Sequence, residues 1–267
     1  MIILPNNWSD YEGRLVRFPH NFTVPAAQAI VMLHGANLNS IEGAAETHAQ
    51  HIEDTGQELL TYADQTNTIL VLPSSGVISP QEVTQQNWDW TGHFDYGRDV
   101  TYIIETIRRI QVLGTIPVFL HGGSAGGVMA WKVANELERM GQIDMIRGLI
   151  CTECISPFST SVTATVPPAY RKLDASKEFS FGGIDFYDYP DVEAQLGLPN
   201  YYTNWAKQML YQYSPNDPIV LSEWKEDFAE ALDEKATALT VKISGTGHDL
   251  GPTGWSDLVT WLQEVAV

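Results

Sequence analysis

The chain has 267 residues, of which 33 are acidic and 15 are basic, so its formal net charge is −18. Hydrophobic residues make up 44% of the sequence and charged residues only 18%, a balance that allows a sizeable core and argues against intrinsic disorder. Binding to phosphates requires clustered Lys and Arg, so the charge also argues against a nucleic-acid partner and against an anionic membrane surface.

The length favours a single domain spanning 1–267, because no Pro/Ser-rich linker or block of charge divides the chain. The N-terminus has no basic region and only a short apolar run, so the sequence predicts neither a signal peptide nor a transmembrane span. We therefore expect a cytoplasmic protein. A secreted protein is the alternative if the numbering begins at a mature or engineered terminus.

Short apolar runs alternate with amphipathic segments along the chain. This pattern predicts an α/β fold with a mostly parallel central sheet of about eight strands and helices on both faces. The expected strands, the first of them weak, are 13–18, 29–34, 68–73, 117–121, 147–151, 207–213 and 239–244. The expected helices are 44–65, 99–113, 126–140, 219–235 and 254–265.

The alternation is interrupted at 156–204, where the chain is rich in Pro, Ser, Thr and aromatic residues. This interval is too long for an ordinary connection and too irregular for one helix. Because its aromatic side chains need a surface against which they can be buried, we expect a cap or lid over the loop edge of the sheet. An excursion that packs against the side of the domain without binding ligand remains open.

A serine lies between two glycines at the junction of an expected strand and an expected helix, in Gly122-x-Ser124-x-Gly126. A nucleophile on so tight a turn has strained backbone angles, so the residues two before and two after it must be nearly free of side chain. The helix that begins at about Ala125 directs its free N–H groups toward an oxyanion formed on the serine. We therefore predict that Ser124 is a nucleophile.

A serine hydroxyl needs a base, and His248 is the best placed of the 7 histidines. It lies in a glycine-flanked loop after the last expected strand, which returns the chain to the carboxyl edge of the sheet. His48 and His51 share an i,i+3 spacing, but no matching Glu or third ligand stands near them in the sequence. We therefore predict no metal site.

The base must be oriented by an acid, and Asp217 follows the penultimate expected strand directly. The chain order Ser, Asp, His is the order found in α/β hydrolases. Two other acids remain open. Glu153 follows the expected strand 147–151, which is one strand earlier in the chain than the strand before Asp217. Asp249 is the neighbour of His248.

An oxyanion hole needs two backbone donors where the negative charge develops. The N–H of Ala125, directly after the nucleophile, is the first candidate. The second should come from the turn after the expected strand 29–34, where Ala36 is our choice and Asn37 is next.

With these residues in this order, the chain resembles α/β hydrolases over nearly its whole length. The segments 86–93 (QNWDWTGH), 95–100 (DYGRDV) and 124–130 (SAGGVMA) resemble more particularly the polyhydroxybutyrate-depolymerase-like and feruloyl-esterase-like group of carboxylic-ester hydrolases. That resemblance implies extracellular cleavage of esters in polymers or plant-wall phenolics. It also implies that Trp88 and Trp90 line or support the acyl side of the cleft, and a core position for one of the two is the alternative.

The sequence departs from this group in two respects. Asn87 stands beside the tryptophan pair, where the group often has a cysteine, and no signal peptide is visible. These departures do not affect the predicted fold or the predicted triad. They weaken the part of the resemblance that concerns the substrate and secretion.

Together these features predict a carboxylic-ester hydrolase that works through an acyl-enzyme, without a metal or an organic cofactor. The expected substrate is a small-molecule or polymeric ester: a feruloyl, acetyl or short-chain acyl ester, or a polyester. A serine peptidase or a thioesterase on the same fold is the alternative enzyme. A hydrolase fold used only for binding is the alternative of another class.

Overall fold

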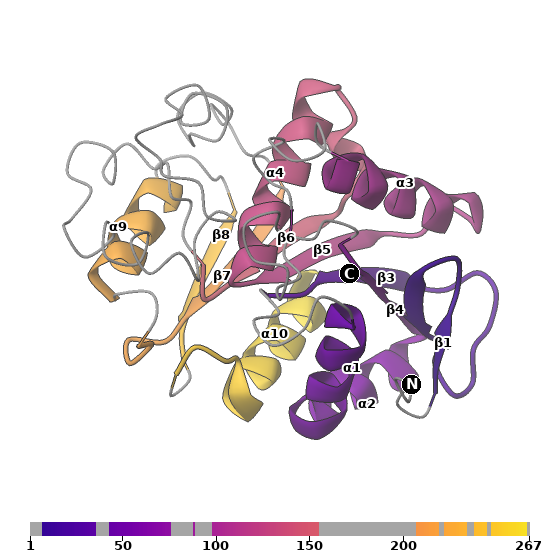
Figure 1. Ribbon diagram of the computed structural model, residues 1–267, viewed down its shortest axis with the longest axis horizontal. Helices are drawn as coiled ribbons and strands as arrows, with labels where there is room; N and C mark the ends of the chain where they lie inside the picture. The colour runs from indigo at the N-terminus through magenta and orange to yellow at the C-terminus, as the bar shows by residue number, and fades with distance from the viewer. Residues whose placement is uncertain are drawn as a thin grey trace.

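One sheet runs through the part of the chain that this computed structural model describes, which is residues 7–35, 43–75, 88, 98–154, 207–218, 222–233, 238–244 and 247–265. Its strand order is β1-β2-β4-β3-β5-β6-β7-β8 (Figure 1). β2 runs antiparallel to both of its neighbours, β1 and β4, and all the other neighbouring pairs are parallel. The strands are β1 Trp8–Asp10, β2 Arg14–Arg17, β3 Gln28–Leu33, β4 Thr68–Pro73, β5 Val118–Gly123, β6 Gly148–Thr152, β7 Gln208–Tyr213 and β8 Leu239–Ile243.

Helices cover both faces of the sheet, as the sequence predicts (Figure 1). One layer contains α3, α4 and α9, and the other contains α1, α2 and α10. None of the helices in the described ranges is both long and apolar enough to cross a membrane. The helices are α1 Ala44–Thr55, α2 Gln57–Thr66, α3 Arg98–Val112, α4 Ala125–Arg139, α9 Ser222–Asp233 and α10 Gly251–Val265, with a 3-10 turn at Ile143–Met145.

The central strands are buried on both sides, which explains their continuous apolar sequences. In β3, Ile30 and Met32 contribute to the core under α1, α2 and α10, whereas Val31 and Leu33 contribute to the core under α3 and α4. All four side chains are fully buried. Successive side chains of a strand point to opposite faces, so a strand covered on both faces needs apolar residues at every position.

The structure differs from the sequence-based prediction in two places. The helix expected at 44–65 is two helices, α1 and α2, because Gly56 leaves the helical path with φ −102° and ψ 31°. A Cβ at Gly56 would lie 2.8 Å from Ile52 O, so only a glycine fits this break. The short strand β1 was not predicted, since three residues are too few to show an alternation. The predicted cap at 156–204 lies outside the described residues.

The parallel strands bring distant parts of the sequence to one edge of the sheet. β5, β6 and β7 are neighbours with parallel pairing, so their carboxyl ends lie together. Ser124 follows β5, Glu153 follows β6, and Asp217 follows β7 after a short turn. Carboxyl ends of parallel strands are the usual position of ligand sites in such sheets.

A substitution of Trp261 tests the packing of α10 against the sheet. The Trp261 side chain is 1% exposed, and its ring meets Phe119 of β5 edge to face, with centroids 5.9 Å apart. We expect Trp261→Ala to lower the free energy of unfolding by about 3–5 kcal/mol in urea denaturation, because the cavity cannot close completely. The control Val112→Ala, at a site that is 85% exposed, should stay within about 0.5 kcal/mol of the wild type. Equal losses in the two variants would contradict this packing.

Candidate active site

Ser124 occupies the turn between β5 and α4, and its backbone is strained there. Its φ is 52° and its ψ is −124°, a combination that residues with a Cβ seldom adopt. Hydrogen bonds hold the turn on both sides: Ser124 N–H donates to Thr152 O at 2.9 Å, and Gly127 N–H donates to Ser124 O at 2.9 Å. The neighbouring strand β6 and the first turn of α4 therefore fix where the Ser124 hydroxyl lies.

The glycines around this turn allow backbone segments to approach closely. A Cβ on Gly122 would lie 2.1 Å from Gly126 O, and a Cβ on Gly126 would lie 2.3 Å from a carbonyl oxygen of β3. Both approaches are far shorter than a carbon–oxygen contact, and both involve backbone that cannot rotate away. Gly123 is different, since a Cβ there would lie 3.9 Å from its nearest neighbour.

This difference makes Gly126 and Gly123 a matched pair of substitution sites. Gly126→Ala should lower the free energy of unfolding by about 3 kcal/mol or more, because the new methyl group overlaps the backbone of β3. Gly123→Ala, the same chemical change three residues earlier, should stay within about 1 kcal/mol of the wild type. Urea denaturation of the two variants is the measurement. A tolerated Gly126→Ala would show that α4 does not pack against β3 as closely as described.

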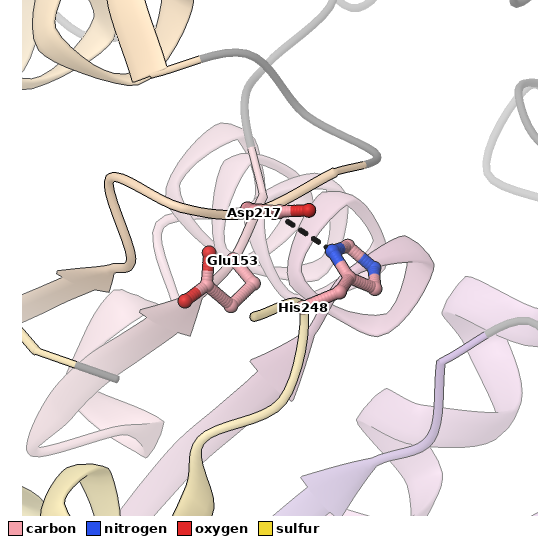
Figure 2. Close-up of side chains that lie close together, drawn as sticks. All are labelled: Glu153, Asp217 and His248. Carbon is pink, nitrogen blue, oxygen red and sulfur yellow. Dashed lines mark hydrogen bonds and ion pairs between the residues drawn. The ribbon is translucent and has the colours of Figure 1, made fainter. Parts of the chain in front are cut away.

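His248 bridges Ser124 and Asp217. Its Nε2 lies 2.8 Å from Ser124 Oγ, and its Nδ1 lies 2.8 Å from Asp217 Oδ2; Figure 2 shows the second contact. The Asp217 side chain is fully buried, whereas the His248 side chain is 18% exposed. Because an ionised carboxylate only accepts hydrogen bonds, Nδ1 carries a proton and Nε2 accepts the hydroxyl hydrogen. The structure thus brings together the three residues that the sequence selected.

The two alternative acids are placed differently. Figure 2 shows Glu153 beside Asp217, with the hydrogen bond of the imidazole running to Asp217. Glu153 contacts Lys225 instead, with Oε2 2.5 Å from Nζ. Asp249 is exposed, at the wall of the cavity beside the serine. Of the three acids, Asp217 is the one whose carboxylate contacts the imidazole, at 2.8 Å.

A buried lysine, which the sequence-based prediction missed, joins the two buried acids. Lys225 Nζ lies 2.5 Å from Glu153 Oε2, 2.6 Å from Asp217 Oδ2 and 3.1 Å from Ser214 O. Its side chain is 0% exposed. An ammonium group has three donors, so these three acceptors satisfy it completely.

The sequence does contain a signal for this lysine. Ala229 and Leu232 follow Lys225 on the same face of α9, and Leu232 is 1% exposed within the core. A lysine at an apolar-face position of an amphipathic helix cannot be buried without a partner, because an unpaired buried charge costs several kcal/mol. Such a position therefore predicts a buried carboxylate in a neighbouring element.

Glu153 has an unusual environment for a carboxyl group. Burial raises its pKa from 4.5 to about 8; the Lys225 ammonium opposes this shift, and the negative charge of Asp217 reinforces it. Its backbone also has a positive φ, 48°. Glu153 therefore exchanges its proton close to neutral pH, where an ordinary glutamate is ionised.

This shift predicts a pH dependence of stability that Glu153→Gln removes. Because the folded-state pKa of Glu153 lies above its ordinary value, the folded protein binds the proton more tightly than the unfolded chain. The contribution of this proton to the free energy of unfolding is present below about pH 4.5 and is lost as the pH rises to about 8. The excess stability of the wild type over the variant should therefore decline across that window in urea denaturation.

The matched control for this measurement is Glu105→Gln, on the partly exposed side of α3. The control should leave the pH dependence of the wild type unchanged. A difference between the wild type and Glu153→Gln that stays constant from about pH 5 to about pH 8 would contradict the raised pKa of Glu153.

Glu153, Asp217 and His248 also form the one group, among the residues that the structure describes, whose ligand atoms could surround a metal ion. These atoms lie within 4.8 Å of one another. The Lys225 ammonium, however, already lies 2.5 and 2.6 Å from the two carboxylates. A divalent cation would have to displace this buried positive charge, so the donor set fits an ion-pair network and does not fit a metal centre.

The predicted oxyanion donors lie partly within the described structure. Ala125 is the first residue of α4, where backbone N–H groups are not used inside the helix. The turn after β3 packs against the serine, since a Cβ on Gly35 would lie 3.5 Å from Ser124 Cβ. Ala36 and Asn37, one of which we expect to supply the second N–H, lie outside the described residues.

Trp88 supports this turn. Its indole Nε1–H donates to His34 O at 2.7 Å, and the two rings stack with centroids 4.3 Å apart. Trp88 is 4% exposed and belongs to the core; the described lining of the cavity does not include it. The structure thus gives Trp88 a contact that orients the turn beside Ser124. Trp90 lies outside the described residues.

His34 itself is held in one protonation state. Burial lowers its pKa to about 4, so the ring is neutral. Its Nδ1–H donates to Gly35 O at 2.7 Å, and its Nε2 accepts from Ser75 N–H at 3.2 Å. The ring therefore uses both nitrogen atoms to fix the backbone next to Ser124.

A cavity of about 230 Å³ opens beside Ser124. Its walls include His48 and His51 of α1, His121 of β5 and Trp255 of α10. Burial lowers the pKa of His121 to about 4 and that of His48 well below 6.5, so both rings are neutral. Their Nδ1 atoms have no hydrogen-bond partner within the described part of the chain. The cavity thus places two neutral imidazoles next to the serine, together with the acids Glu153 and Asp249.

The sequence matches no family model and no curated protein, whereas solved structures share its fold. Est1E from Butyrivibrio proteoclasticus is 15% identical, with 96% of this chain and 97% of that one covered and a TM-score of 0.58. An α/β hydrolase from the sediment metagenome of the Mar Chica lagoon, Morocco, is 12% identical, with 97% of each chain covered and a TM-score of 0.57. A butyrate-bound esterase from Thermogutta terrifontis is 16% identical, with 94% and 87% covered and a TM-score of 0.60. The chain therefore has the α/β-hydrolase fold that the sequence predicts.

Proposed function

We propose that the protein hydrolyses carboxylic esters through an acyl-enzyme formed on Ser124. The proposal rests on the continuous hydrogen-bond chain from Ser124 Oγ through His248 to Asp217, with 2.8 Å at each step. A serine hydroxyl is a weak nucleophile at neutral pH unless a base accepts its proton, and the base needs an acid that fixes its tautomer. The fold shared with esterases supports the same conclusion.

The reaction follows from these contacts. Ser124 Oγ attacks the ester carbonyl while His248 Nε2 accepts the hydroxyl proton, and Asp217 stabilises the imidazolium that forms. The N–H of Ala125, with a second N–H from the turn after β3, stabilises the negative oxygen of the tetrahedral intermediate. His248 then passes the proton to the leaving alcohol. Water attacks the acyl-enzyme by the same steps, and none of them requires a metal or a cofactor.

The surroundings of Ser124 support a short acyl group as the substrate. The cavity of about 230 Å³ beside it combines the apolar walls of Leu33, Leu250 and Trp255 with neutral imidazoles. The Thermogutta terrifontis esterase of the same fold binds butyrate, a short-chain acid. The net charge of −18 disfavours anionic acyl carriers, because no excess of basic residues attracts their phosphates. Feruloyl esters, acetylated sugars and polyesters complete the substrate class.

Variants of the triad test the proposal. Ser124→Ala and His248→Ala should each lower kcat by about 10⁶-fold on p-nitrophenyl acetate and butyrate, because either change removes the activated nucleophile. Asp217→Asn should lower kcat by about 10⁴-fold, since the imidazole loses its partner and its tautomer. The control Ser9→Ala, at an exposed position of β1, should keep the wild-type rate. A fluorophosphonate should label the wild type and Ser9→Ala but not Ser124→Ala.

The alternative outcomes are distinct. A wild type that shows neither fluorophosphonate labelling nor turnover above Ser124→Ala would contradict a catalytic serine and favour a binding protein. Cleavage of peptide p-nitroanilides or thioesters in preference to oxygen esters would reassign the enzyme to a peptidase or a thioesterase. If Glu153→Gln lost more activity than Asp217→Asn, the acid would be Glu153. A panel of feruloyl esters, acetylated sugars and a polyester film then identifies the substrate.

A further inference from the structure

Two further charged side chains, Lys225 and Glu153, lie beside the acid of the triad, Asp217. One oxygen, Asp217 Oδ2, contacts both His248 Nδ1, at 2.8 Å, and Lys225 Nζ, at 2.6 Å. The ammonium and the imidazole therefore compete for the same negative charge. A fixed cation at this position weakens the stabilisation that the carboxylate gives to an imidazolium, because charges interact strongly at short range in a buried site.

Glu153 compensates for this cation. Its Oε2 lies 2.5 Å from Lys225 Nζ, and the Glu153 and Lys225 side chains are 3% and 0% exposed. With both carboxylates ionised, the group of Glu153, Asp217 and Lys225 has a net charge of −1, the charge of a lone triad aspartate. With a proton on Glu153, the net charge is zero, and Asp217 is opposed by an equal buried positive charge.

We propose that Lys225 and Glu153 are positioning residues of the triad that act through its acid: the Lys225 ammonium draws part of the Asp217 charge away from His248, and ionisation of Glu153 restores the net charge that stabilises the imidazolium. This inference rests on the proposed function, because it concerns the same nucleophile and base. Both residues act through Asp217, whose Oδ2 contacts Lys225 and His248.

The other titratable side chains around Glu153, Asp217 and Lys225 do not supply the negative charge that offsets the Lys225 ammonium. Burial raises the pKa of Tyr211 and of Cys151 well above their ordinary values, so both are neutral. The Tyr211 hydroxyl donates to Cys154 O at 2.8 Å. Glu226 of α9 and Asp249 beside the base are exposed, where water screens them. Within the described chain, Glu153 is therefore the group whose ionisation changes the charge next to Asp217.

The raised pKa of Glu153 places its ionisation at a pH where activity can be measured. This pKa of about 8 means that the net charge of Glu153, Asp217 and Lys225 passes from zero to −1 as the pH rises through about 8. An imidazolium next to Asp217 is stabilised more strongly in the second state. Activation of Ser124 should therefore continue to increase above neutral pH.

The test measures the second-order rate of Ser124 phosphonylation by a fluorophosphonate, and kcat/KM for p-nitrophenyl butyrate, from about pH 6 to about pH 9.5. In phosphonylation the Ser124 oxygen bonds to phosphorus, fluoride leaves and the proton passes to His248. This rate reports activation of the serine without requiring that the natural ester be known. The variants are Glu153→Gln and the double variant Glu153→Gln/Lys225→Met, which has no buried positive charge.

We expect the wild-type rates to rise near pH 8, where Glu153 ionises. Glu153→Gln should react within about threefold of the wild type near pH 6 and about 10- to 100-fold more slowly near pH 9, because the acid end stays neutral. The double variant should lack the rise near pH 8 and should match or exceed the wild type at pH 7. A purely structural role of the pair would lower all rates in parallel without changing the profiles.

The matched control is Lys207→Met, which removes a partly exposed lysine, directly before β7, that pairs with the exposed Asp144. It should keep the wild-type profile. Urea denaturation checks that each variant is folded. If Glu153→Gln does not fold, the double variant, in which Asp217 keeps its hydrogen bond with His248 Nδ1, decides the test.

Two results would overturn the proposal. One is a rise near pH 8 that persists in the double variant. The other is a double variant that is folded yet about 100-fold slower than the wild type at every pH. Absence of any labelling of the wild type would instead contradict the proposed function. In that case, the pH dependence of unfolding in Glu153→Gln still reports the ionisation of the buried acid.

Discussion

The strained backbone at Ser124 is the constraint on which the rest of the structure depends. A positive φ at a residue with a Cβ costs on the order of 1–3 kcal/mol, and the turn persists because β5 and α4 are both packed in the core. Gly122 and Gly126 allow the helix to cross the strands at a distance that any side chain would prevent. The same parallel sheet that holds this turn also delivers the ends of β6 and β7 beside it.

Burial of charge is the second determinant of the site. A net charge of −18 spread over the surface is solvated and favours solubility. Below the surface each charge needs a partner, and Lys225 has Glu153 and Asp217 within 2.6 Å. Such a network contributes little net stability, because desolvation of the ions offsets their attraction. The network instead affects the orientation of the Asp217 carboxylate and the proton affinity of the groups around it, and Asp217 contacts the base His248.

In contrast to these buried ions, two buried histidines near Ser124, His34 and His121, are neutral. Burial favours the uncharged form of an imidazole, and His34 and His121 both have a pKa of about 4. Neutral rings donate and accept hydrogen bonds without opposing the imidazolium that the reaction forms. His34 applies this property to the backbone, and Trp88 stacked on it holds the turn after β3 against the nucleophile.

The sequence by itself determined the features that depend on local pattern: the alternation of strands and helices, the glycine spacing around Ser124, and the chain order of Ser124, Asp217 and His248. It left the choice among three acids open, because each of them follows a strand that ends at the same edge. Only the tertiary structure decided that Asp217 contacts the imidazole. Lys225 was not predicted, since its partner Glu153 is 72 residues away in the chain and periodicity describes one helix at a time. Contacts between elements decide the charge of a site: the apolar-face position of Lys225 indicates that a buried partner exists, but only the tertiary structure identifies that partner as Glu153.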